Sequence, residues 1–232
     1  MVWGVREPAD PGNLLPGGNF VGYDEQLSKH FHENLTDEER AIYKNRFASY
    51  DYAVGRKFFH EMGVSIGGGI APTPIEDHEW PREFRLAKTR KNLGAMFHSG
   101  CGYAVSETLK TIIEGFELGV HQFSPLKITM PRDQEWPEPY YTMVIGRFLT
   151  SFSRDHTPEE VWEETKYASI TLRHWDMKTY RNMVFSRDVI GTSHLWRERK
   201  QIPFKIMMSD PLMDAIKAAG LKIFQHIQAK EI

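Results

Sequence analysis

The chain has 232 residues, enough for one large domain or two modest ones, and its 41% hydrophobic content can fill a sizeable core. The formal net charge of -2 argues against a protein that binds nucleic acid or a membrane directly, because such proteins usually carry a basic excess. The single cysteine, Cys101, excludes an intramolecular disulfide framework and suits a reducing compartment. The start of the sequence does not resemble a signal peptide, and no run approaches the roughly 20 apolar residues of a membrane span, so we expect a cytoplasmic protein.

The N-terminal third is expected to contain an arm and one long helix. Residues 1–35 are rich in Gly, Pro, Asn and Asp, which favour turns and predict an irregular arm with at most a short strand at 2–5. Thr36 and Glu39 form a capping-box pattern, and aromatic or apolar residues then recur every three or four positions. This spacing predicts a helix over 37–62 and a Gly/Pro-rich connection up to residue 83, so that 36–83 is a helical segment with its connection.

From residue 84 the pattern alternates between helical and extended segments, which predicts an α+β fold with mixed or antiparallel sheets and flanking helices. Helices capped by Ser106, Thr157 and Ser209 are expected at 106–118, 158–166 and 210–219. Aromatic and β-branched residues predict strands near 120–129, 140–149, 167–175, 181–186 and 221–228.

Two segments repeat elsewhere in the chain. Val105-Ser-Glu-Thr-Leu109, followed by Val120-His-Gln-Phe123, resembles Met208-Ser-Asp-Pro-Leu212, followed by Ile223-Phe-Gln-His226. Each copy has the pattern of a strand end, a serine cap, an amphipathic helix and a returning strand. The repeat therefore predicts two similar strand–helix–strand units.

Residue patterns typical of catalysis are weak. His30 and His32 have no third ligand at a recognisable spacing, and no Gly-x-Ser-x-Gly motif is present, so we expect no metal, no cofactor and no catalytic residues. The densest polar and aromatic cluster is His194-Leu-Trp-Arg197, which follows Asp188. Arg197 in this cluster is a candidate for binding an anion beside Trp196. Alternatively, the cluster is a structural corner in which Trp196 is buried.

Three segments of the C-terminal part resemble the signature of the imm-eleven immunity family: Arg187-Asp-Val-Ile-Gly-Thr-Ser-His-Leu-Trp-Arg197, Ile206-Met-Met-Ser-Asp-Pro-Leu212 and Ala219-Gly-Leu221. Upstream blocks at 105–109, 120–125 and 140–141 are similar too, and the resemblance extends over residues 84–232. It implies a bacterial immunity protein that is encoded beside a polymorphic or contact-delivered toxin and neutralises it in a tight complex. It brings no catalytic residues, and its signature positions look like caps, core and corner residues: Ser106, Leu109, His194, Trp196, Arg197, Ser209 and Leu212.

Two loops are candidates for contacting such a toxin, because each combines acidic groups with a tryptophan that is followed by proline. The candidate partner-binding residues are Glu76, Asp77, Glu79, Trp80, Asp133, Glu135, Trp136 and Glu138. If both loops were exposed together, they would suit a basic toxin surface such as that of a nuclease. Alternatively, each tryptophan fixes its own loop to the body of the protein.

Two other functional classes stay open at this stage. A small-molecule enzyme would require a pocket that gathers His174, Asp188, His194 and Arg197. A structural or regulatory interaction module without a toxin partner is the third class, and the absence of a toxin gene beside this one would favour it.

Overall fold

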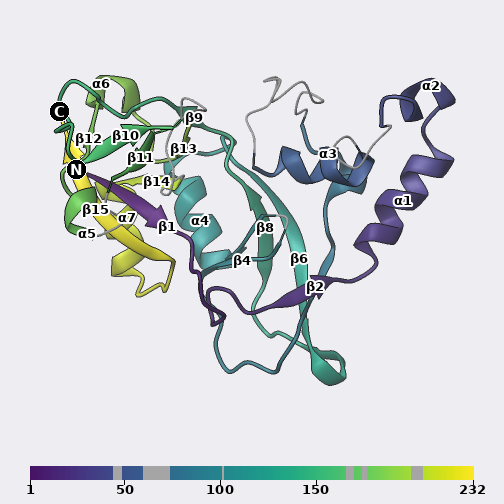
Figure 1. The fold of residues 1–232 in the computed structure, drawn as a ribbon. Helices are drawn as coiled ribbons and strands as arrows, with labels where there is room; N and C mark the ends of the chain where they lie inside the picture. The colour runs from purple at the N-terminus through teal and green to yellow at the C-terminus, as the bar shows by residue number, and fades with distance from the viewer. Residues whose placement is uncertain (44–48, 60–73, 101, 166–169, 174–176, 200–205) are drawn as a thin grey trace.

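The computed structural model describes the chain except residues 44–48, 60–73, 101, 166–169, 174–176 and 200–205 (Figure 1). The fold is α+β, as predicted. Its helices are α1 (Tyr23–Glu33), α2 (Asp37–Arg40), α3 (Tyr50–Lys57), α4 (Glu107–Phe116), α5 (Met177–Tyr180), α6 (Arg187–Ile190) and α7 (Asp210–Ala218), with 3-10 turns η1 (Asp77–Glu79) and η2 (Pro131–Asp133).

The first sheet joins the two ends of the chain. In spatial order its described strands are β12 (Val184–Phe185), β15 (Gln225–Glu231), β1 (Val2–Arg6), β14 (Ile206–Ser209), β13 (Leu195–Glu198) and β9 (Phe148–Leu149). The N-terminal strand β1 lies between β14 and β15 and is antiparallel to both, so Val2 faces Ser209 on one side and Ala229 on the other. The expectation of an irregular arm over 1–35 is therefore wrong, because this segment contains β1, β2 (Gly18–Phe20) and α1.

The second sheet is formed mainly by the middle of the chain. Its described strands run in the order β2, β3 (Glu83–Leu86), β6 (Gln122–Met130), β8 (Tyr140–Val144), β5 (Tyr103–Ser106) and β4 (Met96–His98), and β7 (Gln134–Glu135) pairs with β6. A small antiparallel pair, β10 (Trp162–Glu164) and β11 (Ile170–Leu172), stands apart from both sheets.

The two sheets contain the same arrangement of strands, in agreement with the predicted repeat. In the second sheet the neighbours β3 and β6 are parallel, and the pairs β6–β8, β8–β5 and β5–β4 are antiparallel. The corresponding neighbours β12 and β15 are parallel in the first sheet, and β15–β1, β1–β14 and β14–β13 are antiparallel. In each unit a helix, α4 or α7, connects two parallel strands that are separated by one antiparallel strand. In the second sheet this central strand is β8, which comes after the strand–helix–strand unit in the sequence. In the first sheet it is β1, which comes from the N-terminal end of the chain.

Both connecting helices begin as their sequences predict. The Ser106 side chain accepts a hydrogen bond from the amide of Leu109, and the Ser209 side chain accepts one from the amide of Leu212. Each serine therefore satisfies an amide that has no partner within its helix. The expected helices at 106–118 and 210–219 are confirmed as α4 and α7.

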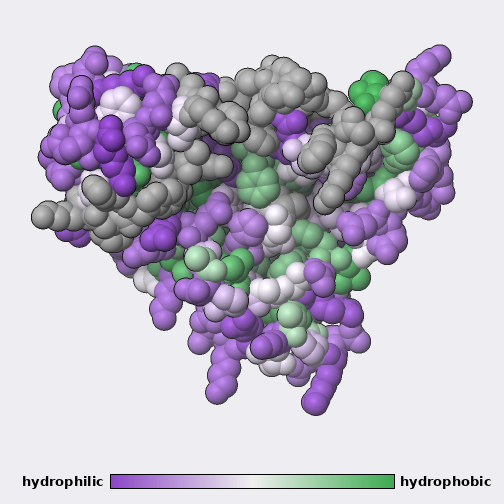
Figure 2. Space-filling model, viewed as in Figure 1, coloured by the Kyte–Doolittle hydropathy of each residue, from purple (hydrophilic) through white to green (hydrophobic). Residues whose placement is uncertain are grey.

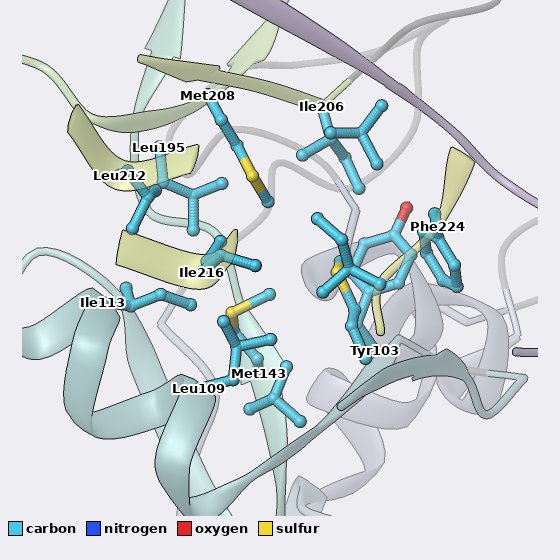
Figure 3. Packing of buried hydrophobic residues seen from close by; sticks show 14 of the residues in the cluster. Tyr103, Leu109, Ile113, Met143, Leu195, Ile206, Met208, Leu212, Ile216 and Phe224 are labelled. Carbon is cyan, nitrogen blue, oxygen red and sulfur yellow. The ribbon is translucent and has the colours of Figure 1, made fainter. Parts of the chain in front are cut away.

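The main hydrophobic core lies between the two units and receives side chains from both sheets and both helices (Figure 3). Tyr103 and Met143 come from the second sheet, and Leu195, Ile206 and Met208 come from the first. Strand residues alternate between this core and the outer faces, as the two-residue period of a strand requires. Trp196 and Met207 thus pack into a separate cluster on the other face of the first sheet.

The predicted continuous helix over 37–62 is wrong. The capping box at Thr36 is confirmed, but it starts only the single turn α2, and α3 begins anew after Ser49, whose backbone is extended. The Tyr43 and Tyr50 ring centroids lie 5.3 Å apart, and both rings contact Phe31 of α1. Seven residues along one straight helix span about 10 Å, so the two rings lie closer together than a continuous helix would place them. Both rings pack on α1 instead. The part of the prediction at 60–62 lies outside the described residues.

The predicted helix at 158–166 is also wrong, because residues Trp162–Glu164 form strand β10. Thr157 does not cap a helix: its hydroxyl donates to the Ser153 carbonyl and accepts from the Val184 amide. Long-range bonding thus overrides the local start signal. Strands at the other expected places are shorter or shifted, as at 184–185 and 225–231, and parts of 167–175 lie outside the described residues.

Candidate partner-binding surface

The helical unit, which we define as α1, α2, α3 and η1, covers the outer end of the second sheet (Figure 1). Glu79 of η1 lies at its centre and is 2% exposed. Its carbonyl accepts a hydrogen bond from the Tyr23 hydroxyl of α1 at 2.8 Å, and its carboxylate forms an ion pair with Lys57 of α3. Because one residue binds both helices, η1 fixes their relative position.

The predicted partner-binding loop at 76–81 is only partly available to a partner. Trp80 is 7% exposed and packs edge-on against Phe58, and Glu79 is buried as described above. Glu76 and Asp77 are exposed, but Asp77 already pairs with Arg82. The tryptophan thus fixes its own loop to the body of the protein, which is the alternative that the sequence left open.

The second predicted loop lies at the opposite end of the same strand pair. Strands β3 and β6 are parallel, η1 precedes β3, and η2 follows β6, so the structure does not bring the two loops together. Asp133 pairs with Arg85 at 2.9 Å, and Glu135 pairs with Lys127 at 3.6 Å. Trp136 is half-buried against the outer face of the second sheet, and Glu138 is exposed.

Two histidines stack where α1 meets η1. The rings of His30 and His78 are 3.4 Å apart and nearly parallel, and His78 Nε2 lies 2.6 Å from the Tyr50 hydroxyl. Burial, the neighbouring His30 and, to a smaller extent, the Lys57 ammonium lower the pKa of His78, and the carboxylates of Glu79 and Glu76 do not reverse this shift. The Tyr50 pKa is raised well above its usual range, first by burial and then by the charge of Glu79.

The lowered pKa of His78 makes the stability of the helical unit depend on pH. The unfolded chain takes up a proton at about the ordinary value of 6.5, and the folded chain does so only at lower pH. We therefore expect His78 to contribute nothing above that value and to destabilise the fold as pH falls below it. Urea unfolding between pH 7.5 and 5 measures this effect, with His78→Phe as the variant that stacks but cannot titrate. An unchanged pH profile in this variant would contradict the assignment.

A groove of about 480 Å³ runs between α1 and α3. We call it the α1–α3 groove, and neither candidate loop contributes to it. Its apolar lining residues are buried or half-buried, and most of its polar ones are exposed. The lining residues are Asp24, Leu27, Ser28, Phe31, Tyr43, Ser49, Tyr50 and Asp51.

The immunity protein family Imm11 matches residues 21–231 of this chain. The chain belongs to this family. No curated protein matches the chain. The match begins at residue 21, so the expectation that the family part starts at residue 84 is wrong, and the helical unit with its groove belongs to the family's matched region.

Within this Imm11 chain, the signature residues have structural roles. Ser106 and Ser209 cap helices, and Leu109, Trp196 and Leu212 are fully buried. His194 binds the hydroxyl of Ser209 through Nδ1 at 2.8 Å, and its ring lies beside Phe116. In this chain these residues therefore serve as helix caps and core residues, and Trp196 belongs to the cluster on the outer face of the first sheet.

The histidine and arginine of the signature do not form a common site in this Imm11 chain. Arg197 is 4% exposed and lies over the rings of Phe59 and Tyr103, each at 5.3 Å. His194 contacts α4, and Asp188 is exposed on α6. The candidate His174 lies outside the described residues. Within the described ranges, no three His, Cys, Asp or Glu side chains form a group that could hold a metal.

The sequence pattern does not reveal the α1–α3 groove of this family member. The aromatic residues Tyr43 and Tyr50 belong to the spacing that predicts one long helix, whereas in the structure that helix is interrupted between them and both line the groove. No helix in the described part of the chain is long and apolar enough to cross a membrane.

Proposed function

We propose that the chain is an immunity protein that binds a cognate bacterial toxin and neutralises it in a tight protein–protein complex in the cytoplasm. The observation that carries this proposal is the Imm11 match over residues 21–231, which includes the helical unit and most of both sheets. The dispersal of His194, Asp188 and Arg197 gives no support to the alternative of a small-molecule enzyme.

Neutralisation of a toxin by stoichiometric binding requires high affinity. A nanomolar dissociation constant corresponds to about -12 kcal/mol, which specific interfaces typically reach with about 1,600 Å² of buried surface. An immunity protein therefore needs a large surface with a few anchoring contacts, and it needs no reactive side chains.

The test uses the toxin that this proposal expects to be encoded beside the chain. Co-expression of the chain should restore growth to cells that produce the toxin, and it should not protect them from an unrelated toxin. Calorimetry with a catalytically inactive toxin should give a one-to-one complex with a nanomolar dissociation constant. No protection, together with no complex at micromolar concentrations, would refute the proposal.

A further inference from the structure

We propose that the α1–α3 groove is the docking site for a segment of the toxin in which an arginine or lysine lies next to an apolar side chain. This inference rests on the proposed function and specifies which surface of the immunity protein makes the anchoring contact. Its three supports are the shape of the groove, the chemistry of its lining and the charge of the helical unit.

The groove has the size and the floor of a site for large side chains. Its volume of about 480 Å³ is within the range of pockets that hold small ligands or anchoring residues. Leu27, Phe31, Tyr43 and Tyr50 line it, and the three aromatic rings contact one another with centroids 5.3 to 6.0 Å apart. Such a floor binds methylene groups and aliphatic side chains, and its aromatic faces attract a cation.

Two exposed carboxylates, Asp24 and Asp51, border this floor from opposite helices. Neither forms an ion pair with another residue that the structure describes. By contrast, Asp77, Asp133 and Glu135 of the two candidate loops are each paired with a cation of this chain. Among the described residues, the groove therefore offers acidic groups that no cation of this chain neutralises, next to apolar surface that would shield a pair with a partner's cation from water.

The charge of the surrounding segment favours the same partner. Residues 21–82 contain eleven Asp and Glu against seven Lys and Arg, whereas the whole chain is nearly balanced at 31 against 29. Figure 2 shows hydrophilic residues over the outer side of α1 and α2 and hydrophobic residues on the side that faces α3. The acidic excess would attract a basic toxin surface over several ångströms before contact.

Both aspartates also lie in the first turns of their helices, where a negative charge is favourable to the helix dipole. That structural role alone would explain an acid at each position. A test must therefore separate binding from helix stability, and α1 offers a matched residue for this purpose. Glu25 is an exposed acid in the same first turn, and it does not line the groove.

The experiment measures the affinity of the full-length chain for the inactive toxin encoded beside it. Asp24→Lys and Asp51→Lys should each weaken binding by about 30-fold or more, the scale of a hot-spot contact, whereas Glu25→Lys should change it by less than about threefold. Ser28→Arg keeps both aspartates and places a bulky cation on the rim, and it should weaken binding similarly. Thermal unfolding checks that each variant is folded.

Four outcomes are distinguishable. Selective loss of affinity in the groove variants, with a strong salt dependence in the wild type, supports the docking site. Wild-type binding that Asp24→Lys, Asp51→Lys and Ser28→Arg leave unchanged would overturn the groove and leave the immunity function standing. A loss of affinity only in the double variant Asp133→Lys/Glu138→Lys would assign the contact to the second candidate loop instead. No binding by the wild type would remove both proposals together.

Discussion

Replacing Glu117 by alanine should destabilise the protein by about 3–5 kcal/mol, because the change removes a buried carboxylate and leaves its partners unpaired. Glu117 ends α4 and accepts hydrogen bonds from the Leu195 amide at 2.8 Å and from His121 Nε2 at 3.0 Å. Its other oxygen lies 3.0 Å from Arg147 Nε. One side chain therefore connects the end of α4, which packs against the second sheet, with strand β13 of the first sheet.

The protonation states in this cluster follow from the hydrogen bonds. His121 Nδ1 accepts from the Gly146 amide, so its Nε2 carries the proton that it donates to Glu117. Burial alone would raise the pKa of Glu117, but the bonds from His121 and the Leu195 amide outweigh it and lower the pKa. The stabilisation by Glu117 is thus complete above its ordinary value of 4.5 and is lost as pH falls through the lowered folded value.

Chemical denaturation of three variants tests this account. Glu117→Gln keeps a hydrogen-bonding group and should lose clearly less stability than Glu117→Ala. Glu114→Ala, on the same helix, removes only a partly exposed pair with Lys110 and should change stability by less than about 0.5 kcal/mol. If Glu117→Ala and Glu114→Ala lost the same unfolding free energy, the buried hydrogen bonds of Glu117 would stabilise the fold no more than the partly exposed ion pair of Glu114 does.

Replacing Trp196 by alanine should cost a similar amount, about 3–5 kcal/mol, for a different reason. Trp196 is 0% exposed and is among the largest fully buried side chains of the described residues. It packs on the outer face of the first sheet with Val2, Tyr180 and Met207. Its removal would leave a cavity that the surrounding strands cannot fill without breaking their pairing.

Trp136→Ala provides the comparison for this second prediction. Trp136 is only half-buried, so its removal should cost less than half as much. Denaturation midpoints with unchanged slopes give both values. A loss below about 1.5 kcal/mol for Trp196→Ala would mean that the site collapses around the missing ring.

Features encoded by neighbouring residues could be predicted from the sequence. The caps at Ser106 and Ser209 involve amides three positions away, so their residue types alone identify the starts of α4 and α7. The repeat was visible because the same local pattern occurs twice. The α+β class follows from such local patterns, and it is confirmed.

Features that depend on distant partners could not be predicted. Local composition indicates at most a short strand at 2–5, and only the pairing of β1 with strands more than 200 residues away makes it central to a sheet. Phe31 of α1 contacts both Tyr43 and Tyr50, on either side of the break between α2 and α3, and Trp162 pairs with β11. A helical period in the sequence does not reveal such contacts. The burial of Trp80 likewise depends on Phe58 of α3. The roles of the candidate partner-binding residues stay a prediction.

The position of β1 also determines when the first sheet can form. Its neighbours β14 and β15 lie more than 200 residues further along the chain, so β1 must wait until that stretch has been synthesised. At about 5–20 residues per second, this delay is roughly 10–45 s, during which both edges of β1 are unpaired. The second sheet, apart from β2, draws its strands from a continuous stretch and can form earlier. A nascent chain would therefore carry the helical unit before the first sheet has closed, and ribosome-bound chains of increasing length would reveal that order.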